Sequence, residues 1–137
     1  MEIQQKLKVP ATYFYESVIR SVIHDIDQST GRVIEKDQLQ GFEYSKTFSD
    51  GSQAKMTIEK AKENREYQFR TVTSRNEFVA SYTITPIDEE NCEVNYHESI
   101  TSEGMIQQIN DLLVGWLLGY FKKKQFKAML ESIESSY

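Results

Sequence analysis

The sequence predicts an α+β fold in which helices cover one face of an antiparallel sheet. Three observations lead to this prediction. Along six segments apolar residues alternate with polar ones, as in strands that bury one face. Two further segments repeat apolar residues three and four positions apart, as in amphipathic helices. Along the chain, the order is a strand, a helix, five strands separated by short turns, and one long helix.

The N-terminal part of the chain predicts a strand followed by a helix. Residues 3–9 alternate in the way a half-buried strand requires, and Pro10 stands where proline is tolerated at the start of a helix. From Ala11 to about residue 28 the apolar residues have helical spacing, and Gly31 lies where a left-handed cap would end the helix. The pattern is also compatible with a break near Ser21 into two shorter helices.

Five strands follow a poorly patterned segment, Arg32–Gln40, which could hold a short edge strand at its start. Asp50-Gly51 is a hairpin signal between the first two of the five strands. Because polar residues fill the alternate positions, we expect a meander with one solvated face. The inward positions are Phe42, Tyr44, Lys46 and Phe48; Ala54, Met56 and Ile58; Tyr67, Phe69, Thr71 and Thr73; Phe78, Ala80, Tyr82 and Ile84; Cys92, Val94, Tyr96, Glu98 and Ile100.

Residues 101–137 contain no proline and predict one long helix, the element around which we expect the sheet to curve. Trp116 and Tyr120 share an apolar face that we expect to line a cavity between helix and sheet. Val114, Leu118 and Phe121 form a stripe on the opposite side. That stripe would contact either the N-terminal helix or a second copy of the chain in a homodimer. A bend near Gly119 would accommodate the rotated apolar positions that follow.

Composition excludes several classes of protein. A chain of 137 residues fits one domain, residues 1–137. The net charge of −5 argues against nucleic acid as a partner. A single cysteine, Cys92, suits a reducing compartment, and we expect a cytoplasmic location because no signal peptide is apparent. The apolar run 112–121 is about half the length of a membrane span.

The order of elements resembles the START-like (SRPBCC, helix-grip) superfamily. The resemblance lies at Val9-Pro10-Ala11-Thr12-Tyr13-Phe14-Tyr15 and at the start of the terminal helix, Thr101-Ser102-Glu103-Gly104. Gly41-Phe42-Glu43-Tyr44-Ser45-Lys46 and Tyr96-His97-Glu98 are similar to a small bacterial branch whose function is unassigned. The resemblance implies a curved sheet of six or seven strands around the long helix, with a cavity for a small apolar molecule. A seventh strand would have to come from Arg32–Gln40.

The candidate ligand-binding residues are aromatic or charged residues at inward positions. Several tyrosine hydroxyls could give an apolar pocket convergent polar groups, although a packed core with tyrosines at its rim fits equally well. Lys46 and Glu98 would need partners in such surroundings, as a Lys–Glu pair in the cavity, unless each reaches solvent at a strand end. The full set is Tyr44, Lys46, Tyr67, Phe69, Tyr82, Tyr96, Glu98, Trp116 and Tyr120.

Three functions are compatible with this pattern. The first is non-enzymatic binding of a small apolar or amphipathic ligand, which leads because catalytic groups are scarce. The second is an enzyme of the cyclase or hydrolase type with Glu98 as general base. The third is an interaction module that dimerises through the outer face of the terminal helix. We expect no cofactor and no metal, because His24, His97 and Cys92 lack metal-ligand spacing.

Overall fold

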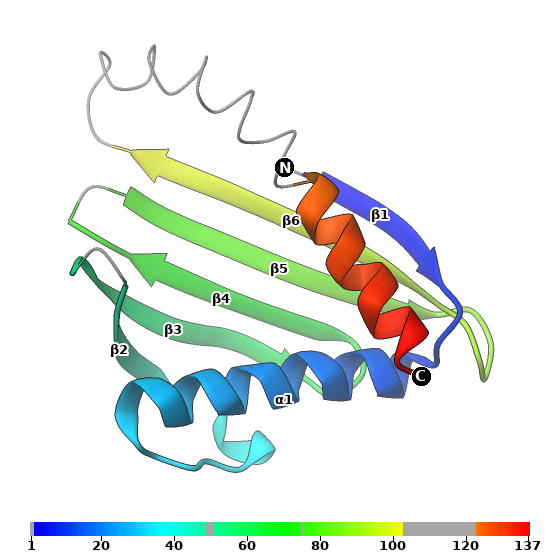
Figure 1. Ribbon diagram of the computed structural model, residues 1–137, viewed down its shortest axis with the longest axis horizontal. Coiled ribbons are helices and arrows are strands. Elements are labelled where there is room, and N and C mark those ends of the chain that lie inside the picture. The colour runs from blue at the N-terminus through cyan, green and yellow to red at the C-terminus, as the bar shows by residue number, and fades with distance from the viewer. Residues whose placement is uncertain (1, 49–50, 75, 103–122) are drawn as a thin grey trace.

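The computed structural model describes residues 2–48, 51–74, 76–102 and 123–137. Six strands form one antiparallel, curved sheet in the order β1-β6-β5-β4-β3-β2 (Figure 1). The elements are β1 (Glu2–Leu7), α1 (Ala11–Thr30), the 3₁₀-helix η1 (Lys36–Gln38), β2 (Glu43–Thr47), β3 (Gln53–Lys62), β4 (Glu66–Val72), β5 (Asn76–Pro86) and β6 (Cys92–Ser102). Residues 123–135 are also helical and are called the C-terminal helical segment below. The predicted α+β fold is confirmed.

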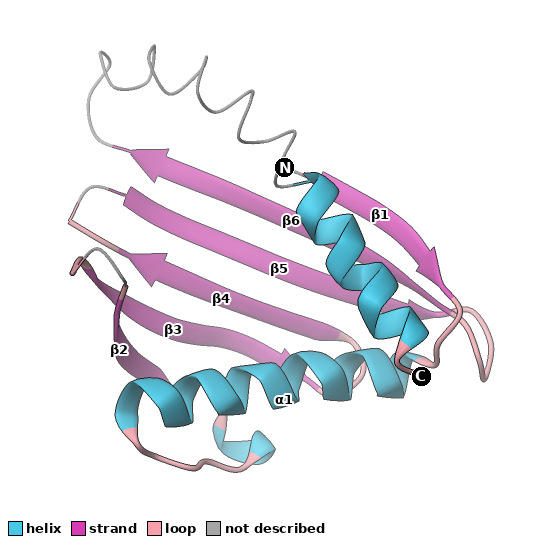
Figure 2. Ribbon diagram, in the orientation of Figure 1, coloured by secondary structure: helices cyan, strands magenta, loops and turns pink. Residues whose placement is uncertain are grey.

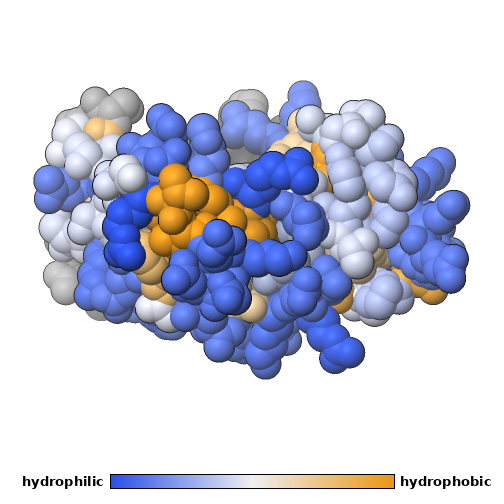
Figure 3. Space-filling model, turned by 90° about the horizontal axis from the view of Figure 1, so that it is seen from below, coloured by the Kyte–Doolittle hydropathy of each residue, from blue (hydrophilic) through white to orange (hydrophobic). Residues whose placement is uncertain are grey.

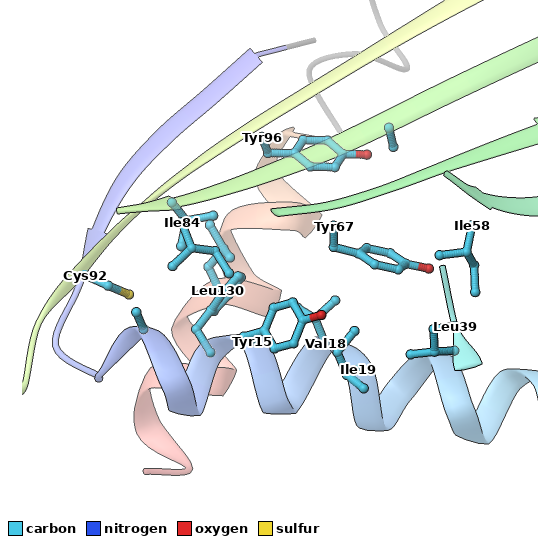
Figure 4. Packing of buried hydrophobic residues seen from close by; sticks show 14 of the residues in the cluster. Tyr15, Val18, Ile19, Leu39, Ile58, Tyr67, Ile84, Cys92, Tyr96 and Leu130 are labelled. Atoms are coloured by element: carbon cyan, nitrogen blue, oxygen red, sulfur yellow. The ribbon is translucent and has the colours of Figure 1, made fainter. Parts of the chain in front are cut away.

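Both long helical elements lie on the same side of the sheet (Figure 2). α1 contacts β2 and β5, and the C-terminal helical segment lies over β5 and β6 in the same view. Side chains from all three parts meet between the layers, among them Ile84 of the sheet, Val18 of α1 and Leu130 (Figure 4). The buried core therefore lies between the concave sheet and its two helical covers.

The helix α1 is continuous, so the break considered near Ser21 does not occur. Its apolar residues Phe14, Val18 and Ile26 are buried on the side that faces the sheet. Gly31 adopts a left-handed φ of 74° and its N–H bonds to the carbonyl of Asp27, as expected for a glycine that ends a helix. No described helix is long and apolar enough to cross a membrane.

The segment Arg32–Gln40 contains no strand, so the seventh strand considered from the sequence is wrong. Lys36–Gln38 form a 3₁₀-helix closed by a capping box between Glu35 and Gln38. The main-chain N–H of Glu35 donates to Oε1 of Gln38 at 3.1 Å. Ile34 and Leu39, on either side of this turn, are buried and pack in the hydrophobic core. Local side-chain capping and two apolar contacts thus take the place of an edge strand.

The alternation predicted for the strands is confirmed at the centre of the sheet. Tyr67, Ala80 and Val94 are buried on the inner face. At the ends of strands the pattern fails, because Ile100 is 55% exposed and Phe48 38% exposed. The outer face carries polar contacts, such as the ion pairs of Arg70 with Glu59 and Glu77 and of Lys55 with Glu43. One face of the meander is therefore solvated, as expected.

The predictions for the first part of the long helix lie outside the described residues. They concern Trp116 and Tyr120 as cavity residues, and Val114, Leu118 and Phe121 as a dimer stripe. In the described C-terminal helical segment, Leu130 is fully buried, and Phe126 and Ile133 pack against the core. This segment is therefore part of the same hydrophobic core as α1 and the sheet.

Leu130→Ala should show how much the C-terminal helical segment contributes to folding. We expect the free energy of unfolding to fall by about 2–5 kcal/mol, because the substitution opens a cavity at a fully buried site. Met129→Ala is the matched control, since Met129 is 38% exposed, and it should cost about 1 kcal/mol or less. Urea unfolding followed by circular dichroism measures both. Equal losses for the two variants would contradict the described packing.

Candidate functional site

A pocket of about 390 Å³ lies between α1, the inner face of the sheet and the C-terminal helical segment. The chain positions it through three elements whose apolar sides converge without filling the space completely. Its apolar walls include Val18, Val22, Met56, Phe69, Met129 and Ile133. Its polar lining residues include Ser17, Ser21, Asp25, Lys46 and the tyrosines Tyr44, Tyr67 and Tyr82. An apolar hollow with a few convergent polar groups is the usual form of a ligand site.

A row of tyrosines crosses the inner face of the sheet and supports the pocket. Tyr67 is paired with Tyr82, and Tyr82 with Tyr96, in neighbouring strands. The ring centroids of Tyr82 and Tyr96 are 4.9 Å apart, and those of Tyr67 and Tyr82 are 6.1 Å apart. Phe126 stacks on Tyr96 with a centroid distance of 4.1 Å. Cross-strand aromatic pairs of this kind stabilise the sheet and also fix the rings that line the pocket.

Asp25 of α1 is the centre of a polar cluster at the pocket, formed with Lys46 and Tyr44 of β2. Lys46 Nζ lies 2.6 Å from Asp25 Oδ1, and the Tyr44 hydroxyl donates to Asp25 Oδ2 at 2.7 Å. The side chains of Lys46 and Asp25 are 31% and 32% exposed. Both oxygens of the carboxylate are therefore engaged, while the ion pair remains accessible from the pocket.

Within this cluster the pKa of Asp25 is lowered, whereas the pKa of Tyr44 is raised. Burial alone would raise the pKa of Asp25, but hydrogen bonds from Lys46 and Tyr44 and the nearby Lys46 charge outweigh it, and the pKa is lowered. The pKa of Tyr44 is raised by burial and by its bond to the Asp25 carboxylate. The pKa values of Tyr67, Tyr82 and Tyr96 are also raised, mainly by burial. At neutral pH the Asp25 side chain is therefore a carboxylate, and the phenols of these tyrosines are protonated.

The structure brings together five of the nine residues named from the sequence. Tyr44, Lys46, Tyr67, Phe69 and Tyr82 are among the described residues that line the pocket. Tyr96 and Glu98 lie on the same face of β6 but are not among these lining residues, and the Tyr96 hydroxyl donates to Glu98 Oε2 at 2.6 Å. Trp116 and Tyr120 lie outside the described residues.

The pair considered between Lys46 and Glu98 does not match the sheet order. β2 and β6 are separated by three strands, so the two positions are roughly 19 Å apart measured along the sheet. Lys46 pairs with Asp25 instead. Sequence reasoning missed Asp25, although a signal was present. It follows Val18 by seven positions and Val22 by three, which places a carboxylate on the apolar face of the helix.

The other candidate groups do not suggest chemistry. Cys92 is fully buried, and burial raises the pKa of its thiol to about 11, so it is a poor nucleophile at neutral pH. His97 points outward as expected, with its side chain 57% exposed. Within the described ranges, no group of three His, Cys, Asp or Glu side chains could hold a metal ion.

Two further hollows lie beside α1. A groove of about 720 Å³ runs between α1 and residues 132–136 and adjoins the pocket, since both are lined by Ser17, Ser21, Asp25 and Ile133. A hollow of about 310 Å³ separates α1 from the segment around η1 and contains the solvent-exposed ion pair of Lys36 with Glu16. Seen from the side of α1, the surface is mainly hydrophilic, with one larger apolar patch (Figure 3). Most residues that line the groove are polar, among them Ser17, Arg20 and Gln28, so the groove gives the pocket a polar mouth.

Alkaline titration should reveal the buried tyrosines. The pKa is raised above its ordinary value for five of the seven tyrosines in the described part of the chain, Tyr15, Tyr44, Tyr67, Tyr82 and Tyr96. In the unfolded chain all tyrosines ionise near pH 10. The stability from these five is therefore present below about pH 10 and is lost as the pH rises further. Phenolate absorbance at about pH 11 should show fewer ionised tyrosines in the folded protein than in guanidinium chloride, where all eight should have ionised.

Asp25→Asn should change the acid dependence of stability. Because the pKa of Asp25 is lowered in the folded state, its stabilising effect is present above the ordinary carboxyl value of about 4 and is lost as the pH falls through the folded value. We expect wild type to be more stable than Asp25→Asn by about 1 kcal/mol at pH 6, and this difference should shrink below about pH 4. Asp37→Asn, at an exposed position of η1, is the control for urea unfolding at each pH. A difference that grows on acidification would contradict the prediction.

Three solved structures show what fold this is. A START superfamily protein from Mycobacterium smegmatis matches with a TM-score of 0.58 and 11% identity over 100% of this chain and 98% of that one. Norcoclaurine synthase from Thalictrum flavum matches with a TM-score of 0.64 and 10% identity over 98% and 91%. A conserved protein from Geobacillus kaustophilus matches with 0.61 and 15% over 98% and 95%. At these identities the likeness concerns the fold, which is START-like.

Sequence comparison identifies the family. Among curated proteins, none has a sequence that matches this chain. The family model described as "Domain of unknown function (DUF3284)" matches residues 1–119, which is most of the sequence. The chain therefore belongs to the DUF3284 family and has the START-like fold.

Proposed function

We propose that this protein binds a small, mostly apolar ligand in the pocket beneath α1 and releases it unchanged. The observation that supports the proposal most directly is the ion pair of Asp25 and Lys46, joined by Tyr44, beside a pocket of otherwise largely apolar and aromatic walls. Burying polar groups in such surroundings is costly unless they are paired. An accessible polar cluster in an apolar hollow is well suited to orient a ligand.

The pocket walls are suited to a molecule of moderate size. A volume of about 390 Å³ lies within the range of small-molecule sites, which span roughly 300–1,000 Å³. Met56 and Met129 stand among the aromatic residues, and methionine side chains adapt readily to irregular shapes. Apolar area removed from water would supply most of the affinity, at roughly 25 cal/mol per Å². The polar cluster would mainly set the orientation.

The position of the polar cluster favours an amphipathic ligand with its polar end at the mouth. Asp25 lines both the pocket and the adjoining groove, together with Ser17 and Ser21. The apolar residues Met56 and Phe69 line the pocket but not the groove. A ligand with its apolar body against the sheet would therefore place a polar group near Asp25, where water from the groove can also reach it.

Binding is favoured over the enzymatic alternative. Norcoclaurine synthase has the same fold, so the fold is compatible with catalysis as well as with binding. The alternative for this chain depends on Glu98 as a general base, and Glu98 is not among the described residues that line the pocket. The third possibility, dimerisation through Val114, Leu118 and Phe121, concerns residues outside the described ranges and stays a prediction.

Ser21→Trp should block ligand binding without unfolding the protein. Ser21 is exposed on α1 and lines both pocket and groove, so an indole ring there would occupy the mouth. We expect wild type to enhance Nile red fluorescence saturably, and Ser21→Trp to raise the dissociation constant at least about tenfold, which corresponds to about 1.4 kcal/mol. Native mass spectrometry of freshly purified protein would add the mass of any ligand that copurifies.

Thr12→Trp is the matched control, because Thr12 is also exposed on α1 but is not among the lining residues. Its affinity for Nile red should stay within about twofold of wild type. Thermal unfolding of both variants checks that the fold is intact. Failure of wild type to bind Nile red, or equal affinity of wild type and a folded Ser21→Trp, would contradict the proposed pocket.

A further inference from the structure

The geometry points to an uncharged ligand with one hydroxyl or carbonyl group, held by Asp25, Lys46 and Tyr44. This inference rests on the proposed binding function and specifies the class of ligand that the pocket takes. Its basis is the charge balance and the hydrogen-bonding capacity of these three side chains.

The charges of the pocket already balance. Asp25 and Lys46 are the charged side chains among the described residues that line it, and they contact each other at 2.6 Å. An anionic ligand placed here would leave the Asp25 charge and its own charge opposed by one ammonium group. A cationic ligand would leave the opposite imbalance. Because an unbalanced charge is costly when it is partly removed from water, a neutral ligand fits best.

The cluster retains capacity to donate and to accept hydrogen bonds. The Lys46 ammonium has three donor hydrogens, of which one is directed at Asp25 Oδ1. The Tyr44 hydroxyl donates to Asp25 Oδ2, so its oxygen can still accept a bond. A ligand carbonyl could accept from Lys46, and a ligand hydroxyl could also donate to Tyr44 or Asp25. Either group would be satisfied without breaking the existing pair.

The walls beside the cluster favour a ligand that contains rings. Tyr67, Phe69 and Tyr82 line the pocket, and the ring centroids of Tyr67 and Phe69 are 5.8 Å apart. Aromatic side chains bind flat apolar surfaces by stacking or edge contacts. The inferred ligand class is therefore a neutral cyclic molecule, aromatic or polycyclic, with a single oxygen-bearing group at the end that faces α1.

Three probes that share a naphthalene body but differ in charge test this inference: 2-naphthol, 2-naphthoate and 2-naphthylmethylamine. Isothermal titration calorimetry at pH 7 gives the dissociation constant of each. For wild type we expect 2-naphthol to bind about tenfold more tightly than either charged probe. Two reciprocal variants should change this order. Asp25→Asn leaves the Lys46 charge uncompensated and should favour 2-naphthoate, whereas Lys46→Met leaves the Asp25 charge and should favour the amine.

Matched variants outside the pocket serve as controls. Lys55→Met removes a lysine of the outer face whose side chain is 60% exposed, and Asp37→Asn removes an exposed carboxylate of η1. Both should keep the wild-type order of the three probes. Since Asp25 and Lys46 are both partly exposed, we expect their variants to fold, which circular dichroism verifies.

The outcomes separate this inference from the proposed function on which it rests. If wild type binds all three probes within about threefold of one another, or if neither reciprocal variant changes the order, the pocket stands and the inferred ligand class is wrong. If none of the probes binds wild type although Nile red does, the inferred ligand class is wrong and the proposed function stands; if Nile red does not bind either, both are overturned. A preference for 2-naphthol that the two variants shift in opposite directions supports both.

Discussion

Packing of two helical elements on a row of tyrosines is the interaction on which the rest of this structure depends. Tyr67, Tyr82 and Tyr96 cross three neighbouring strands, and no single strand or helix can remove their rings from water. Phe126 covers one end of the row by stacking on Tyr96, and Phe14 of α1 approaches Tyr82 at 6.2 Å between centroids. The two helical elements therefore contact the sheet at different places, and the space left between them is the pocket.

The polar cluster has a structural consequence as well as its proposed role. β2 is an edge strand, hydrogen-bonded to β3 alone among the described strands. Asp25 connects α1 to this edge through Lys46 and Tyr44, in addition to the apolar contacts of the core. An ion pair that is about one third exposed contributes only modestly to the free energy of unfolding. Its main effect is to position the two elements that it joins. It fixes the position of α1 over the strand that borders the pocket.

The sequence predicted those features that depend on local patterns. Strand alternation and helical spacing are properties of neighbouring residues, so the six strands, α1 and the burial of Cys92 could be recognised. Alternation identifies the face of a residue but not its distance from residues of other strands. Lys46 and Glu98 were therefore placed on the correct face of the sheet, but the prediction that they form an ion pair with each other was wrong. Asp25 lies 21 positions before Lys46, and only the packing of α1 on β2 brings the two together.

The fold alone does not determine what this pocket would hold. Structures that share it at 10–15% identity include an enzyme, so the three-dimensional likeness leaves the chemistry open. Differences in function between proteins that share this fold must therefore come from side chains that the fold does not require. Core positions such as Ile58 and Val94 need only be apolar and of suitable size. A carboxylate on the apolar face of α1 is not needed for packing, and its partial burial is tolerated because Lys46 and Tyr44 bind it. Asp25 is therefore the residue at which the chemistry of this chain departs most clearly from the requirements of its fold.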